Sequence, residues 1–447
     1  MENIGKPRDS FRSRRGFIIA CIGSAVGMGN IWLFPYRVAT YGGAFLIAYL
    51  FCVVIIGFTG VIGEMTFGRA MKSGPLGAFQ QASERAGGGR RLGGILSMVP
   101  VVGSLALAIG YSVVVGWIIK YLVGSVSGSI FAAESIGAYF GATVGSFGNI
   151  PYHLIGLAAA FLIMIFGIAR GIEKANKVMM PLFFLLFVAL AVYGGIQSVG
   201  AVGFRAAYAP IFAIDLETLW NPGMWIYALG QAFFSLSLAG SGTLVYGSYL
   251  SDDADIPYCA SMVALFDTLA AFVASFVIIP PMVASGTKMS RSVGLMFLSL
   301  PTLFQSMGRS GQVIMVVFFI AVLFAGLSSL INLFEAPIEA LQTKFRMKRI
   351  SAVGVIAAIG TAVALCIENG DVVSAWMDVC SIYICPVGAL LAAILFFWCC
   401  GKQFVRQQVD LGAKRKLGGW FIPAGRYVFC GLTLLVLILG TVMGSIG

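Results

Sequence analysis

Two short polar segments lie inside long apolar stretches of this sequence. The first reads Gly-Ser-Ala-Val-Gly-Met-Gly-Asn at 23–30, and the second reads Ser-Leu-Ser-Leu-Ala-Gly-Ser-Gly at 235–242. Closely spaced glycines make a poor helix, so we expect both segments to unwind. Unwinding inside a membrane leaves carbonyls and N–H groups without partners, which is tolerated only where they line a cavity or hold a ligand. Free carbonyls suit a cation, and free N–H groups suit a carboxylate.

The alternative is that these glycines only let helices pack closely, as small-xxx-small motifs do. A single segment would leave that alternative open. Two segments at matching positions of two halves, each with hydroxyl or amide side chains between the glycines, instead favour an inverted-repeat transporter with five helices per repeat.

Asp267, Glu64 and Glu335 lie within apolar stretches, where acids are functional hypotheses by default. Asp267 stands deep in Ala-Leu-Phe-Asp-Thr, and an ionised carboxylate there is costly unless a cation or a donor pairs with it. The alternative for Asp267 is a protonated carboxyl in a helix contact. Glu64 and Glu335 lie nearer to helix ends, and we expect them to satisfy loop backbone or to pair with Arg69 or Tyr249.

Residues for enzyme catalysis are sparse. The single histidine, His153, stands at an expected helix start, and the sequence contains neither an HExxH motif nor a recognisable nucleophile–base constellation. A hydrolase is therefore disfavoured. The nine cysteines show no CxxC and no paired extracellular spacing, so they indicate neither a disulfide framework nor a metal site. A channel is disfavoured because the polar residues cluster at mid-depth instead of forming a continuous pore.

The elements that position these residues follow from composition. Hydrophobic residues make up 59% of the chain and charged residues 11%, against roughly 25% charged in soluble domains. The apolar residues form runs of about twenty or more, the length that crosses a bilayer as helix, without the alternation of a barrel. The sequence therefore predicts an all-α polytopic membrane protein. Its eleven expected spans are 16–40, 44–70, 95–124, 152–169, 176–198, 223–250, 258–284, 310–342, 351–368, 375–400 and 426–446.

We expect these spans to form one transmembrane domain over residues 1–447. The two inverted repeats would cover about 16–198 and 223–400, with helices one and six unwound, and the helix at 426–446 would be additional. No organic cofactor and no obligate protein partner are expected.

The formal charge of +11 raises the question of nucleic-acid binding, which the position of the basic residues answers. They gather before the first span and in every second loop, so the positive-inside rule predicts a cytoplasmic N-terminus and, with eleven spans, an outside C-terminus. The charge then reflects topology, and nucleic-acid binding is disfavoured. The first apolar run shows no cleavage site, so we expect it to remain as a helix in the cell's inner (plasma) membrane.

The polar segments belong to longer motifs that resemble a known family. GSAVGMGNIWLFPY, GQAFFSLSLAGSGTLVYGSYL and AGLSS are similar, in this order, to motifs of the neurotransmitter:sodium symporter family. The similarity runs over nearly the whole chain and implies a leucine-transporter-like fold that imports amino acids by alternating access. Many members have twelve helices, whereas eleven are expected here, as in some bacterial relatives.

The resemblance also implies where two sodium ions bind. One ion in the family lies beside the substrate carboxylate, and the other lies between the first and eighth helices. The matching positions are Ala25, Asn30, Ser235 and Asp267 for the first ion, and Gly23, Val26, Ala325, Ser328 and Ser329 for the second. Each position can supply the oxygen that a hard cation prefers.

The substrate positions follow from the same resemblance. They are Ser24, Ala25, Met28, Gly29, Leu107, Tyr111, Phe234, Ser235, Ser237, Gly240, Ser329 and Leu333. Tyr111 and the N–H groups of Met28 and Gly29 would bind the carboxylate, and Phe234 would act as a lid. Gly240 matches a position where a bulky residue can stand, so we expect room for a larger hydrophobic or aromatic amino acid. Amine-selective relatives carry an Asp near position 24, and its absence favours an amino acid.

The outer gate of the family is only partly kept. Its usual pair of a basic residue and an Asp matches Leu33 and Asp378, which leaves Asp378 either solvated or paired with Arg37. The segment 291–307 is apolar enough to form an extracellular re-entrant lid.

The inner gate also departs from the family pattern. Arg8 matches the family's basic residue, but the position of its acidic partner holds Thr343, and Phe11 replaces the usual Trp. Closure, in which Tyr249 also takes part, is then expected to rely on packing or on other acidic partners, namely Glu335 or Glu339.

Asp267 bears on the coupling ions as well. Chloride-dependent members of the family supply negative charge with a bound anion, so a built-in carboxylate predicts chloride independence. Proton coupling through Asp267 or Glu335, in an amino-acid or amine transporter of the same fold, is the alternative that stays open.

Overall fold

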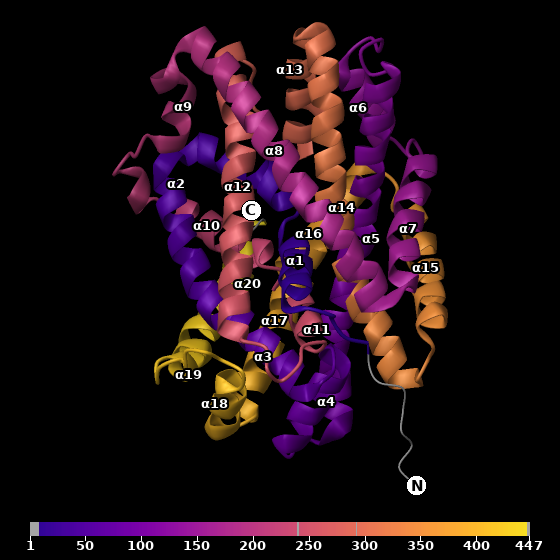
Figure 1. Cartoon of the computed structure of the whole chain (residues 1–447), viewed down its shortest axis with the longest axis vertical. Coiled ribbons are helices and arrows are strands. Elements are labelled where there is room, and N and C mark those ends of the chain that lie inside the picture. Colours follow the sequence, from indigo (N-terminus) through magenta and orange to yellow (C-terminus); the bar gives the residue numbers. More distant parts are fainter. Residues whose placement is uncertain (1–8, 239–240, 292, 445–447) are drawn as a thin grey trace.

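The structure is a computed structural model that describes residues 9–238, 241–291 and 293–444. Every regular element in these ranges is helical, and the long helices run side by side along the length of the molecule (Figure 1). This confirms the all-α polytopic class.

The spans predicted from hydropathy coincide with helices or chains of helices to within a few residues. Beyond the two broken spans, the sequential spans are α5 (Gly89–Ser127), α7 (Ile150–Ile165), α8 (Glu173–Val202), α12 (Ile256–Ser285), α14 (Gly308–Phe345), α15 (Arg349–Cys366), α16 to α17 (Gly370–Val379 and Cys385–Ile394) and α20 (Cys430–Met443). Eight of the described helices are each long and apolar enough to cross a membrane unaided. The remaining crossings are made by shorter helices or by pieces on either side of a break.

The first span is broken, as the glycine pattern predicts. Helix α1 (Arg14–Ala25) ends when Val26 turns to an extended backbone, and the chain regains a helix at the π-helical turn η1 (Gly29–Leu33). It then continues into α2 (Phe34–Ile56), which bends sharply at Gly42, where φ is +64°. That corner separates the first span from the second, which runs on through α3 (Ile62–Met71).

The sixth span is broken in the same way. Helix α10 (Pro222–Ser235) stops at Leu236, and a short helix α11 (Gly242–Gly247) follows. Ser237 and Ser241 flank the break with left-handed φ angles of 59° and 52°, a conformation in which a side chain is strained. The strained serines mark the place where the helix was expected to open.

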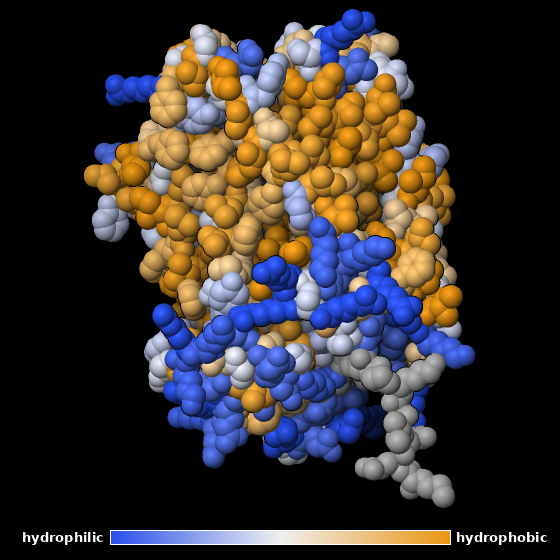
Figure 2. All heavy atoms as spheres, in the orientation of Figure 1, coloured by the Kyte–Doolittle hydropathy of each residue, from blue (hydrophilic) through white to orange (hydrophobic). Residues whose placement is uncertain are grey.

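The two broken spans lie against the long unbroken helices. Helix α1 contacts α8, α12 and α14, and α10 contacts α2. Large apolar side chains such as Leu185 and Ile196 of α8 point outward instead, with exposed fractions of 63% and 67%. Apolar residues also cover much of the face shown in Figure 2, which is the kind of surface that lipid would cover.

Shorter helices cap the two ends of the bundle. Helices α4 (Pro75–Arg85) and α18 (Lys402–Asp410) lie at the end where hydrophilic residues gather, and α6 (Ile136–Val144), α9 (Phe204–Phe212) and α13 (Leu300–Ser306) lie at the other (Figures 1 and 2).

The segment expected to form a lid precedes α14 and does turn inward. Tyr121 donates a hydrogen bond of 2.9 Å to the carbonyl of the buried Phe297, and Val293 reaches the central cavity.

Candidate functional site

A cavity of about 280 Å³ lies between the two helix breaks. Every residue expected to contact substrate lines it, apart from Gly240, which falls outside the described residues. These lining residues are Ser24, Ala25, Met28, Gly29, Leu107, Tyr111, Phe234, Ser235, Ser237, Ser329 and Leu333. The fold therefore gathers positions that are up to about 300 residues apart in the sequence into one space.

One wall of the cavity presents backbone N–H groups that the first break frees. The Met28 N–H donates to the Tyr111 hydroxyl oxygen at 3.1 Å, and the Gly27 N–H donates to Asn30 Oδ1 at 3.1 Å. Only side chains satisfy these two N–H groups, and a carboxylate is a stronger acceptor than either. This wall can therefore bind an anionic group.

A hydrogen-bond acceptor lies where the two breaks meet. The Ser237 hydroxyl donates to the Ser24 carbonyl at 2.8 Å and lies 3.0 Å from the Ser24 hydroxyl. This pair ties the two breaks together and places a carbonyl at the cavity wall, where it can accept from an ammonium.

Asp267 is fully buried on α12 behind this cavity. Its carboxylate accepts from Asn30 Nδ2 at 2.8 Å, from the Ser235 hydroxyl at 2.6 and 2.8 Å, and from the Tyr49 hydroxyl at 3.2 Å. These three donors are all neutral, so they solvate the carboxylate without cancelling its charge. Tyr49 was not predicted, because a tyrosine in an apolar span carries no signal until the fold brings α2 to α12.

A second cluster of oxygens joins α1 to α14. Ser329 Oγ lies 3.1 Å from the Val26 carbonyl and 3.4 Å from the Gly23 carbonyl. Ser328 precedes it on the same helix and is fully buried, as is Ala325. These are the positions expected to hold the second ion, and the oxygens present are of the neutral kind that suits a monovalent cation.

Leu107, Phe234 and Leu333 give the cavity an apolar side, which Val114, Met377 and Ile382 extend. Gln231 was missed by the sequence reasoning, yet it lines the cavity and donates to the Gly29 carbonyl at 3.3 Å. Its only sequence signal is an amide in an apolar span close to the second break.

Leu33 and Asp378, the two positions of the expected outer gate, also line the cavity. Asp378 was expected to be either solvated or paired with Arg37. The Arg37 guanidinium instead lies 3.5 Å from the centre of the Tyr227 ring. The expected pairing with Arg37 is therefore wrong in this conformation, because an aromatic ring on α10 attracts the guanidinium by its π face. Asp378 is exposed at the cavity mouth.

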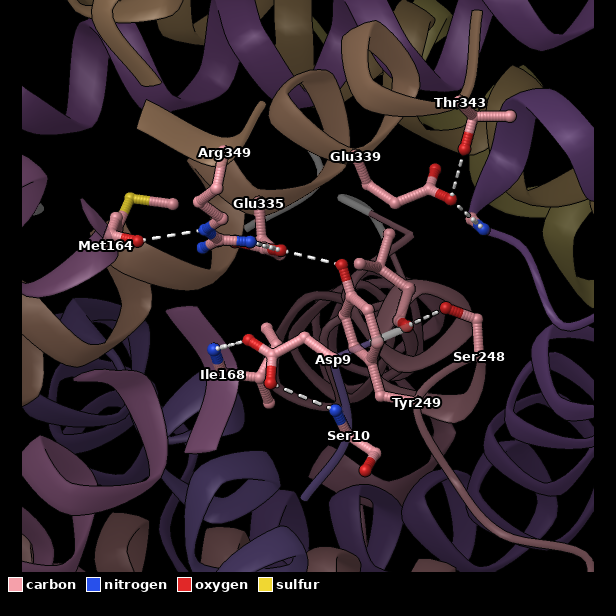
Figure 3. Close-up of polar contacts among 12 residues, drawn as sticks. Asp9, Ser10, Met164, Ile168, Ser248, Tyr249, Glu335, Glu339, Thr343 and Arg349 are labelled. Carbon is pink, nitrogen blue, oxygen red and sulfur yellow. Dashed lines mark hydrogen bonds and ion pairs between the residues drawn. The ribbon is translucent and has the colours of Figure 1, made fainter. Parts of the chain in front are cut away.

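A network of polar contacts joins several helices at the hydrophilic end (Figure 3). Glu335 of α14 forms a two-pronged ion pair with Arg349, at 2.6 and 2.7 Å, and accepts from the Tyr249 hydroxyl at 2.7 Å. Glu339 instead accepts from Thr343 at 2.9 Å and from the Gly74 N–H at 2.9 Å. The expected bond between Glu335 and Tyr249 is present, and Arg349 is a partner that the sequence did not reveal.

Aromatic packing adds to this network. The Phe11 ring lies 5.3 Å from that of Phe17, 5.6 Å from that of Tyr246 and 6.4 Å from that of Tyr249. Arg8, the expected basic member of this gate, falls outside the described residues.

Glu64 does not pair with Arg69 as proposed. It accepts a hydrogen bond from Thr243 of α11, whereas Arg69 donates to the carbonyls of Ala254 and Gln408. Both side chains are buried, and each ties a different piece of the bundle to α3.

The sequence showed no nucleophile–base constellation, but the fold assembles one. His153 lies 2.9 Å from Ser112 Oγ and 3.4 Å from Glu368 Oε2. All three side chains are buried, and none of them lines the central cavity. We interpret the trio as a structural link between α5, α7 and the start of α16, because a substrate in the cavity does not reach it.

The fold and the site together define a class of protein: a helical membrane transporter whose ligand cavity lies where two spans are interrupted. The sequence matches the Sodium:neurotransmitter symporter family over residues 8–139 and 131–444. An uncharacterized sodium-dependent transporter of Methanocaldococcus jannaschii is 31% identical over 444 residues, covering 93% of this chain and 86% of the relative. The sodium-dependent neutral amino acid transporter B(0)AT3 of Mus musculus is 28% identical over 322 residues, covering 65% of this chain and 50% of the relative.

Among solved structures, that of MhsT in complex with L-phenylalanine superposes with a TM-score of 0.84 at 30% identity, covering 96% of this chain and 99% of that one. The chain therefore belongs to the sodium:neurotransmitter symporter family, a family of secondary transporters and not of enzymes.

Proposed function

We propose that this protein is a sodium-coupled symporter that imports amino acids by alternating access. The observation that carries the proposal is the cavity between the helix breaks, where freed N–H groups and a carbonyl face one space. An amino acid carries an ammonium and a carboxylate a short distance apart. The cavity offers an acceptor for the ammonium and donors for the carboxylate. The sodium-dependent transporters among its relatives support the coupling ion.

The surroundings of Asp267 are evidence for the first sodium site. Its charge is met only by neutral donors among the described contacts, and a buried carboxylate gains most from a nearby cation. Sodium beside Asn30, Ser235 and Asp267 would supply that charge, with the Ala25 carbonyl as a further ligand. The Gly23 and Val26 carbonyls, with Ala325, Ser328 and Ser329, would hold a second ion.

A large hydrophobic or aromatic amino acid is the proposed substrate. The substrate carboxylate would take the place of the Tyr111 hydroxyl as acceptor from the Met28 N–H, while Tyr111 donates to it. The side chain would lie against Leu107, Phe234 and Leu333. The solved complex of MhsT with L-phenylalanine supports this size class.

Transport is proposed to be independent of chloride, because Asp267 supplies a fixed negative charge at the place where the family can use an anion. The cytoplasm is proposed to lie at the hydrophilic end that holds α4 and α18 (Figures 1 and 2). The basic loops then lie on the cytoplasmic side of the plasma membrane, and the end of α20 lies on the outer side.

Purified protein in proteoliposomes tests the proposal. Uptake of labelled amino acids would be compared under an inward sodium gradient and under an inward proton gradient, after a sodium-dependent thermal-shift screen of the twenty amino acids has selected the substrate. We expect sodium to drive uptake. Uptake driven by protons alone, with no response to sodium, would instead establish the proton-coupled alternative, in which Asp267 or Glu335 carries the proton.

A further inference from the structure

A buried amide on α8 lies against the second cluster of oxygens, although no sequence motif includes it. Asn176 is fully buried and stands one turn after the start of α8. Its Nδ2 donates to the Ile172 carbonyl at 2.9 Å, and its Oδ1 accepts a hydrogen bond from the Ser328 hydroxyl. The bond to a carbonyl fixes which end of the amide is the nitrogen, so the oxygen must face Ser328.

Gly23 brings the α1 backbone to the same point. A methyl group on Gly23 would collide with both Ser328 Oγ and Asn176 Oδ1. The absence of a side chain there lets three elements, α1, α8 and α14, converge on one small space.

The direction of the Ser328 proton matters for cation binding. A serine hydroxyl has one proton and two lone pairs, and it can bind a cation only through the lone pairs. A helical serine commonly gives its proton to a carbonyl of its own helix, but Ser328 gives it to Asn176 on another helix. The Ser328 lone pairs are then available on the side of α1.

We propose that Asn176 is a positioning residue of the second sodium site: its amide oxygen takes the Ser328 proton and so holds the Ser328 oxygen ready to bind sodium. This inference rests on the proposed sodium-coupled function. Asn176 does not itself have to touch the ion.

The position of Asn176 gives the site a link to the N-terminal segment. Glu173, one turn earlier on α8, accepts from the Arg12 N–H at 2.7 Å and from the Ser13 hydroxyl at 3.1 Å. Asp9 accepts from the Ile168 N–H at 2.5 Å. Glu173 and Asn176 thus lie on the same first turn of α8, which connects the contact with Ser328 to the chain entering α1.

The test is the sodium dependence of binding. In Asn176→Ala, Ser328 loses its acceptor and its proton turns elsewhere, so we expect the sodium concentration for half-maximal thermal stabilisation, and for half-maximal substrate binding, to rise roughly tenfold. Substrate affinity at saturating sodium should stay within about twofold, because Asn176 does not line the substrate cavity. Ionic strength would be held constant with choline.

Two further variants make the test specific. Asn149→Ala removes another fully buried asparagine, at the start of α7, and should leave the sodium requirement unchanged. Asn176→Asp keeps an acceptor for the Ser328 proton and adds negative charge, but it loses the donor to the Ile172 carbonyl. It should therefore be less stable overall and yet require less sodium than the unmodified protein. The second variant tests the inference even if Asn176→Ala does not fold.

The outcomes separate the two levels of the claim. An unmodified protein that ignores sodium would overturn the proposed function and the inference together. A sodium-responsive protein whose requirement is unaltered in Asn176→Ala, or raised as much by Asn149→Ala, would overturn the inference alone. A raised requirement in Asn176→Asp would also overturn it, since the acceptor is retained there.

Discussion

At the scale of single residues, the candidate site depends on groups that have partners only because the first span is broken. The Met28 N–H would donate to a helix carbonyl if the span were continuous. It donates instead to the Tyr111 hydroxyl, which can also act as a donor when a carboxylate arrives. One hydroxyl can therefore serve the empty and the loaded cavity.

Tyr111→Phe is expected to weaken substrate binding roughly tenfold, because a hydrogen bond to a charged group is lost. Binding at saturating sodium measures this effect. Tyr121→Phe is the matched control, since Tyr121 is a buried tyrosine of the same helix whose hydroxyl donates to Phe297 and not into the cavity. Equal affinities in the two variants would remove Tyr111 from the binding site.

Asp267→Asn keeps the shape of the side chain and removes its charge. We expect uptake to fall at least tenfold in chloride-free medium and to recover in part when chloride is added, because an external anion can then supply the missing charge. Uptake of the variant that stays sodium-driven and indifferent to chloride would contradict the role given to the carboxylate.

Site residues that belong to a sequence motif could be predicted from the sequence, and isolated polar residues could not. Asn30, Ser235 and Asp267 stand in or beside recognisable segments, and they do meet. Tyr49 and Asn176 are single polar residues on apolar helices, and their partners lie more than a hundred residues away. Only the three-dimensional arrangement of the helices determines such pairs.

At the scale of elements, hydropathy predicted where the spans lie but not how their pieces join. The first two spans were separated correctly near residue 42, yet the backbone there shows a corner without a loop. Gly42 adopts φ of +64°, and the next N–H, that of Gly43, donates to the Ala213 carbonyl at 2.8 Å. The glycine was visible in the sequence, but its contact with the segment after α9 was not.

Gly42→Ala is expected to destabilise the protein by about 2 kcal/mol, because the residue would be held at positive φ and its methyl would lie 2.5 Å from the Ala213 carbonyl oxygen. A lowered thermal midpoint in detergent measures this. Gly431→Ala on α20 is the control, since a methyl there meets nothing within 4 Å and alanine favours helix. An equal midpoint for both variants would show that the corner tolerates a side chain.

At the scale of the whole molecule, alternating access requires that one end be closed while the other is open. The cavity extends to Asp378, whereas Glu335, Arg349 and Tyr249 join α14, α15 and the turn after α11 at the hydrophilic end (Figure 3). The hydrophilic end thus has a buried ion pair. At the other gate Leu33 stands in place of the family's basic residue, so no such pair with Asp378 can form there. Under the proposed topology, we interpret this asymmetry as an outward-facing arrangement.

Glu335→Gln tests whether that ion pair sets the conformational balance. Arg349 would be left without its charged partner, and breaking a buried pair costs about 3 kcal/mol, so the closed inner end should lose stability relative to the open one. Substrate affinity should then fall roughly tenfold or more, because only the outward-facing fraction binds from outside. Amide hydrogen exchange in residues 9–13 and 246–250 should rise in the same variant.

Glu368→Gln provides the comparison for this experiment, because Glu368 is also a buried acid, whose partner is His153, but lies outside the network at the hydrophilic end. It should lower overall stability without faster exchange in residues 9–13. If Glu335→Gln behaves in the same way, the ion pair serves only stability and the inner end is held by the aromatic packing around Phe11. Faster exchange confined to Glu335→Gln would identify this ion pair as the one that keeps the inner gate closed. It would then replace the family's gate pair, whose acidic residue stands at the position of Thr343.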